Sequence, residues 1–246
     1  MRILITSLVL LFALGSCKNS GPATQIDRHD GKEHQTVVLV HGYNHDSRDM
    51  RVLAGFLEES GYHTVKVDLP LTFQHVEDSA KLFASTVEEI LSGIPEDQTI
   101  FMVGHSTGGL VIRYFLSHHP QSSRVGRAVL IATPNQGSSL AELAGEISDL
   151  LVETFATLNS LRPENISKLG LIDPQHTQVG AIAGNKGNLV IGQLLEKEND
   201  GRVEVHSVFY PGLDAFTVVP YNHHEIHYKI ETANLVIRFF ETGSFD

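Results

Sequence analysis

The sequence predicts an α/β protein with a mostly parallel sheet of about six strands and helices on both faces of that sheet. Short apolar and β-branched runs alternate along the chain with longer segments whose apolar residues recur at helical spacing. This alternation is typical of parallel strands joined by helical crossovers. The 246 residues, of which 41% are hydrophobic, are enough for one large domain with a full core.

Six segments are expected to form strands, because each is short, apolar and rich in β-branched residues, as strands buried on both faces usually are. A proline at position 70 stops the second of them. In chain order the predicted strands are residues 36–40, 63–69, 99–104, 125–132, 179–183 and 215–219.

Helices are expected between these strands. Asp46 or Ser47 can cap a helix that runs to about residue 59, and Gly61 lies just past its end. The later helices place apolar residues on one face, with their polar residues on the other. They are predicted at residues 77–91, around 110–116 and at 228–241.

The segment 138–178 breaks the alternation. Its leucines and isoleucines fall at helical spacing, which predicts one or two amphipathic helices inserted between strands. These helices either pack on the sheet in the ordinary way or form a lid over the site with an apolar face toward an acyl chain. Both interpretations stay open from the sequence.

The first residues are typical of a targeting segment, predicted at residues 1–16. Arg2 precedes an uncharged, mostly apolar run that is too short to span a bilayer. The run ends at LGSC, which resembles the lipobox of bacterial lipoproteins, and Cys17 is the only cysteine of the chain. The resemblance implies lipidation of Cys17 and a membrane-anchored, extracytoplasmic protein; an ordinary signal peptide is the alternative.

Residues 17–35 are polar and lack an apolar period, so we expect a tether there and a folded domain over 36–246. Lys18 and Asn19 replace the Asp that keeps some lipoproteins at the inner membrane, which favours an outer-membrane or surface location. The formal charge of −11 disfavours a nucleic-acid partner, because binding a polyphosphate needs a basic surface. The oligomeric state is not predicted.

The strongest chemical signal is GHSTG at residues 104–108, which matches G-x-S-x-G. It follows a predicted buried strand directly and precedes a predicted helix. A strand that turns sharply into a helix exposes the serine oxygen and places free N–H groups beside it. Ser106 is therefore the predicted nucleophile, and the N–H of Thr107 a predicted oxyanion donor.

Residues 104–115 (GHSTGGLVIRYF) resemble the nucleophile turn of bacterial lipases and esterases of the α/β-hydrolase superfamily. Residues 37–43 (VVLVHGY) and 131–140 (IATPNQGSSL) resemble two further motifs of that superfamily. The resemblance implies an α/β-hydrolase fold, in which the insertion 138–178 is the expected place of a helical lid or cap. It also implies that the N–H of Tyr43, after His41 and Gly42, is the second oxyanion donor.

A serine hydroxyl needs a base, and the base needs a carboxylate to orient it. In this superfamily the acid lies between the serine and the histidine in chain order. Asp200 follows a late predicted strand, whereas Asp214 lies just before the last one and is held in reserve. Residues 199–205 (NDGRVEV) resemble the N-D-G-x-V pattern of lipases, and this resemblance favours Asp200.

The base should follow the last strand, where residues 221–227 (YNHHEIH) contain three histidines. Related lipases often show H-x-x-I here, which aligns His223 with Ile226 and leaves His224 in reserve, with His227 a remote third. A metal site is not predicted, because H-E-x-H is one residue shorter than the zinc-protease motif and no cysteine is available.

These residues predict a carboxylic ester hydrolase that needs no cofactor and acts on an ester or lipid through an acyl-enzyme. The same groups could serve a thioesterase, an acyltransferase or an amidase. A non-catalytic, lipid-anchored binding protein that kept the fold is the alternative outside enzymes. The sequence does not give the acyl length or the alcohol, and calcium binding is neither predicted nor excluded.

Overall fold

The computed structural model describes residues 35–147, 156–195 and 197–246. Six strands form one sheet in the order β2-β1-β3-β4-β5-β6, and all neighbouring strands run parallel. Because the chain crosses back over β1 on its way from β2 to β3, the winding reverses between β1 and β3, where α/β sheets place their sites. The strands are β1 (Thr36–Val40), β2 (His63–Val67), β3 (Ile100–His105), β4 (Val125–Ile131), β5 (Gln178–Gly184) and β6 (Ala215–Val219).

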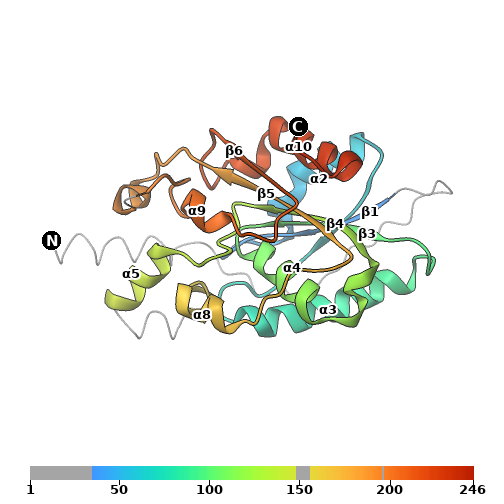
Figure 1. Cartoon of the computed structure of the whole chain (residues 1–246), viewed down its shortest axis with the longest axis horizontal. Coiled ribbons are helices and arrows are strands. Elements are labelled where there is room, and N and C mark those ends of the chain that lie inside the picture. Colours follow the sequence, from blue (N-terminus) through green and yellow to red (C-terminus); the bar gives the residue numbers. More distant parts are fainter. Residues whose placement is uncertain (1–34, 148–155, 196) are drawn as a thin grey trace.

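Helices cover both faces of the sheet. Figure 1 shows α2 (Arg51–Glu59) and α10 (Ile230–Thr242) on one side, and α3 (Val76–Ser92) and α4 (Thr107–His118) on the other. Successive side chains of a strand point to opposite faces, so β1 contributes to two hydrophobic clusters. Val37 packs in the cluster of α2 and α10, and Val38 in that of α3 and α4.

The long insertion after β4 contains helices, as its apolar spacing predicts. In the described part of 138–178 they are α5 (Ser139–Ile147), α7 (Ala156–Ser160) and α8 (Pro163–Lys168). The remaining short elements are η1 (Ser47–Met50), η2 (Pro120–Arg124), η3 (Val190–Leu194), α9 (Val205–Val208) and η4 (Ile226–Tyr228).

The predicted fold class is confirmed, and all six predicted strands are present within two residues of their expected ends. Helix α4 begins at Thr107, before the expected region around residues 110–116, and two further helix starts differ from the prediction. The helix expected from residue 47 begins as the 3-10 turn η1, in which Asp46 accepts a hydrogen bond from the Arg48 N–H at 2.9 Å, and continues as α2. The last helix begins at Ile230, because Lys229 has an extended backbone (ψ 135°), which separates helix α10 from η4.

Across the three described ranges, no helix is both long enough and apolar enough to pass through a bilayer. The predicted signal segment, Cys17 and all of the predicted tether except residue 35 lie outside the described residues.

Candidate active site

Ser106 stands at the turn between β3 and α4, with φ 52° and ψ −125°. A positive φ is uncommon for a residue with a side chain and persists only where the surroundings enforce it. Here they do, because strand and helix are nearly in contact. A Cβ on Gly104 would lie 2.5 Å from Gly109 Cα, and one on Gly108 would lie 2.3 Å from the His41 carbonyl oxygen. The glycines of the motif are therefore required by close approach.

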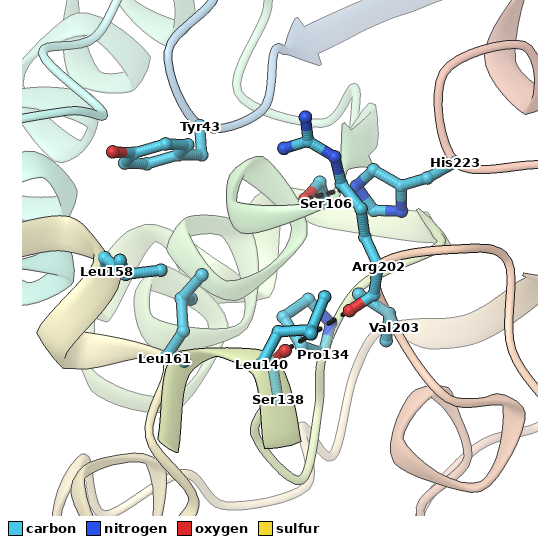
Figure 2. A pocket seen from close by; sticks show the side chains of 11 residues that line it. Tyr43, Ser106, Pro134, Ser138, Leu140, Leu158, Leu161, Arg202, Val203 and His223 are labelled. Atoms are coloured by element: carbon cyan, nitrogen blue, oxygen red, sulfur yellow. Dashed lines mark hydrogen bonds between the residues drawn. The ribbon is translucent and has the colours of Figure 1, made fainter. Parts of the chain in front are cut away.

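Figure 2 shows His223 directly beside Ser106 in the wall of a cavity. Its Nε2 lies 3.0 Å from Ser106 Oγ, and its Nδ1 lies 2.7 Å from Asp200 Oδ2. All three side chains are buried. The structure thus brings together the three residues that the sequence pattern singled out, at hydrogen-bond distances that a proton relay needs.

Asp200 is held firmly in its turn. Its Oδ1 accepts hydrogen bonds from the backbone N–H groups of Arg202 and Val203, at 2.9 and 2.8 Å. Gly201 has φ 95°, a left-handed conformation that glycine adopts without strain, which explains the N-D-G sequence. The backbone also joins the acid to the base, because His223 N–H donates to the Asp200 carbonyl at 2.9 Å.

The loop after β1 runs directly alongside the nucleophile. A Cβ on Gly42 would come within 3.0 Å of Ser106 Cβ, and Tyr43 lines the cavity with Ser106. His41 fixes this loop: its Nδ1 donates to the Gly42 carbonyl at 2.9 Å and its Nε2 accepts from the Leu69 N–H at 3.1 Å. Burial lowers the pKa of His41, which keeps the ring neutral, as the second bond requires.

His224 and Asp214, the alternative base and acid, lie apart from Ser106. His224 is exposed beside His223, with ring centroids 6.4 Å apart, and its backbone N–H binds the Asn222 side chain at 3.1 Å. Asp214 Oδ2 accepts from the Val179 N–H at 2.7 Å, at the start of β5. Because Ser106 lies at the opposite, carboxyl ends of the strands, Asp214 as the acid is ruled out by the parallel sheet itself.

The cavity beside Ser106 and His223 is mostly apolar, and helices of the 138–178 insertion form part of its wall (Figure 2). Arg202 is the one cationic residue among those that line it, and no sequence motif pointed to it. The residues lining the cavity are Tyr43, Ser106, Pro134, Ser138, Leu140, Ala141, Leu158, Leu161, Arg202, Val203 and His223.

A second group of buried side chains, which the sequence did not reveal, lies behind the base. Asp49, His105 and His227 each place one ligand-type atom within 4.8 Å of the others. The rings of His105 and His227 are stacked, with centroids 3.9 Å apart and an angle of 27° between their planes. Imidazole binds a metal ion through a nitrogen lone pair that lies in the ring plane. In two stacked rings these lone pairs point in parallel planes and do not converge on one ion. The stacking therefore fits a packed cluster better than a metal centre. The closest polar contact within it is 3.2 Å, between His227 Nε2 and Asp49 Oδ2, and Nδ1 of each histidine is buried without a hydrogen-bond partner among the described residues.

The sheet, the helices on both faces and the strained serine turn are the features of an α/β hydrolase, and residues 35–165 match the family model described as alpha/beta hydrolase fold. The chain belongs to this family.

Among solved structures, the chain resembles the mature form of Bacillus licheniformis lipase BlEst2, with a TM-score of 0.70, 22% identity, and coverage of 90% of this chain and 96% of that one. It also resembles the metagenomic carboxyl esterase MGS0156, with a TM-score of 0.64 and 20% identity over 81% of this chain and 67% of that one. At these identities the likeness shows the fold alone.

Two curated relatives match over shorter stretches. Norfluorocurarine synthase 2 from Strychnos is 30% identical over 134 residues, which are 48% of this chain and 50% of the relative. Putative methylesterase 14 from Arabidopsis thaliana is 30% identical over 99 residues, or 38% of this chain and 28% of the relative. The matches thus span half or less of these relatives.

Proposed function

We propose that the protein is a serine esterase that hydrolyses carboxylic esters through an acyl-enzyme. One observation carries the proposal: a single imidazole, that of His223, lies 3.0 Å from Ser106 Oγ and 2.7 Å from Asp200 Oδ2. Such a chain of contacts activates a hydroxyl that is otherwise a weak nucleophile at neutral pH. The names of the relatives, which include a lipase, a carboxyl esterase and a methylesterase, support the same reaction class.

In the first step, Ser106 Oγ attacks the ester carbonyl carbon while His223 Nε2 takes the hydroxyl proton. Asp200 holds the Nδ1–H tautomer and stabilises the imidazolium that forms. The backbone N–H groups of Thr107, the first residue of α4, and Tyr43 bind the developing oxyanion. The C–O bond to the alcohol then breaks, and the alcohol leaves with the proton from His223.

In the second step, His223 takes a proton from a water molecule, whose oxygen attacks the acyl carbon. The bond to Ser106 Oγ breaks, the serine recovers its proton from His223, and the carboxylic acid is released. All proton transfers use groups of this chain, so the reaction as proposed needs no cofactor.

The apolar wall of the cavity supports an acyl chain as the bound part of the substrate. Leu140, Leu158 and Leu161 from the insertion supply much of this wall beside Ser106. We therefore propose that segment 138–178 acts as a lid or cap that contributes the acyl site. A series of p-nitrophenyl esters of increasing chain length tests this; a deletion within the segment should lower kcat/KM most for the longest chain, and an equal loss for all chains would contradict it.

The reaction class is tested with the variant Ser106→Ala on a chromogenic ester. We expect activity to fall by at least about 10³-fold while the melting temperature stays the same. Activity equal to that of the wild type would overturn the proposal. Parallel assays with a thioester and an amide distinguish the related activities, and a protein that turns over none of these substrates would be a binding protein.

A membrane anchor at Cys17 is a separate proposal that rests on the LGSC sequence alone. Mass spectrometry of the mature protein tests it. A lipid-modified Cys17 at the N-terminus is expected, and an unmodified N-terminus elsewhere would contradict lipidation.

A further inference from the structure

His223 is bound at its backbone as well as at its ring. Its N–H donates to the Asp200 carbonyl at 2.9 Å, and its own carbonyl lies 3.1 Å from His105 Nε2. With the two ring contacts to Ser106 and Asp200, all four polar atoms of His223 have a partner. The base is therefore held by hydrogen bonds to its backbone as well as to its ring, and His105 makes one of the two backbone bonds.

The bond to the carbonyl determines how His105 is protonated. A carbonyl oxygen only accepts, so Nε2 of His105 must carry the proton, and Nδ1 then holds a lone pair. His105 is 3% exposed, and burial lowers the pKa of its ring well below the usual value, so the ring stays neutral. The motif G-x-S-x-G leaves this position open, so the serine turn itself does not require a histidine there.

His227 packs behind His105, and Asp49 in turn contacts His227. The His227 ring stacks on the His105 ring, and His227 Nε2 lies 3.2 Å from Asp49 Oδ2. The Asp49 carboxylate also accepts a hydrogen bond from the Tyr228 hydroxyl. Burial alone would raise the pKa of Asp49, but contact with His227 and Tyr228 lowers it to about 2, so the carboxylate is charged at neutral pH.

This cluster joins the two loops that the reaction needs. Asp49 belongs to η1, six residues after Tyr43 on the loop that follows β1. His227 belongs to η4, four residues after His223. His105 lies between the loops, since a Cβ on Gly42 would come within 3.2 Å of its Nδ1. One buried group thus contacts the loop with the proposed oxyanion donor and the loop with the proposed base.

We propose that Asp49, His105 and His227 form a positioning cluster that holds the base loop, through the His223 carbonyl, at the distance from Ser106 that proton transfer requires. The inference rests on the proposed ester hydrolysis. None of the three residues lines the cavity beside Ser106, so they act through His223. Because small displacements of a positioned group can cost about 10²-fold in rate, loss of the cluster should lower kcat and leave KM nearly unchanged.

The test compares variants at position 105 on a chromogenic ester. His105→Leu removes the donor, and we expect kcat to fall about 10-fold to 100-fold with KM within twofold. His105→Gln can place an amide N–H where Nε2 lies, so we expect it to recover most of the activity, to within about threefold of the wild type. His118→Leu, at an exposed site at the end of α4 away from Ser106, is the matched control and should keep wild-type kinetics.

Asp49→Asn is the second variant, and it tests the positioning role even if His105→Leu does not fold. It keeps the shape of the side chain and removes the charge, and we expect kcat to fall about fivefold. The double variant Asp49→Asn with His105→Leu should be no slower than His105→Leu alone, because residues that act through one contact are not additive.

Equal kcat values for the Leu and Gln variants, a loss confined to KM, or additive effects in the double variant would each overturn the positioning role. Stoichiometric zinc in the purified protein, lost together with activity on chelation, would also overturn it and would make the cluster a metal site. A wild-type protein without Ser106-dependent esterase activity would instead remove the proposed function on which the inference rests.

Discussion

Replacing Asp200 by Asn probes the proposed proton relay with little change in shape. In the wild type, Asp200 Oδ2 accepts from His223 Nδ1, and Oδ1 accepts from two backbone N–H groups of the same turn. The Asn oxygen can keep both backbone bonds, so the turn should survive. The Asn amide group, however, donates toward His223 Nδ1, which forces Nδ1 to accept and moves the ring proton to Nε2.

An imidazole with its proton on Nε2 cannot take the proton of Ser106 Oγ, which lies 3.0 Å from that nitrogen. A wrong tautomer of this kind typically lowers kcat about 10⁴-fold, which corresponds to about 5 kcal/mol in the activation free energy. Because the cavity wall is untouched, KM should stay within a few fold. The loss should therefore appear in kcat alone.

The assay is steady-state hydrolysis of a p-nitrophenyl ester, with melting temperatures to show that the variant is folded. Asp214→Asn is a matched control, since Asp214 also accepts a backbone N–H bond, at 2.7 Å, but lies far from Ser106. We expect the control to keep kcat within about twofold. A folded Asp200→Asn protein that retains more than a tenth of the wild-type kcat would refute the reasoning.

Three further predictions follow from packing and charge. Gly108→Ala should prevent soluble expression, because the added Cβ would lie 2.3 Å from the backbone oxygen of His41. In Gly55→Ala the added Cβ meets no atom within 4 Å, so this variant should raise the unfolding free energy by about 0.5–1 kcal/mol. Leu158→Trp narrows the cavity and should shift the preferred ester to a shorter acyl chain; an unchanged chain-length profile would contradict this. Burial lowers the pKa of both His41 and His105, so the unfolded chain binds more protons than the folded protein below about pH 6.5. The free energy of unfolding, measured by urea denaturation, should therefore fall between pH 6.5 and pH 5.5, by up to about 1 kcal/mol for each ring. The unfolding free energy of the His105→Gln protein should fall less over this pH range, because one of the two rings is gone. A fall equal to that of the wild type would contradict the lowered pKa of His105.

Much of the fold could be predicted because its signals are local. Each strand is a short apolar run, and the serine turn is marked by glycines that backbone contact demands. The choice of Asp200 over Asp214 follows from chain order in a parallel sheet, since only residues after a strand reach the edge where Ser106 lies.

The choice between His223 and His224 depends on which way one loop folds, and a sequence pattern says little about that. In the structure, Ile226 is fully buried and anchors the loop, which points His223 inward and leaves His224 in solvent. The cluster behind the base was missed for a related reason. Asp49 and His227 are far apart in the chain, and only the packing of η1 against η4 brings them together.

The central claim is that Ser106 becomes acylated, and a trapped intermediate tests it most directly. The protein is mixed with a short-chain p-nitrophenyl ester, quenched in acid within the burst of nitrophenol release, and digested for peptide mass mapping. The account predicts one acyl group per chain, attached to Ser106. An acyl group on another residue, or steady turnover of the ester by the Ser106→Ala protein, would contradict it.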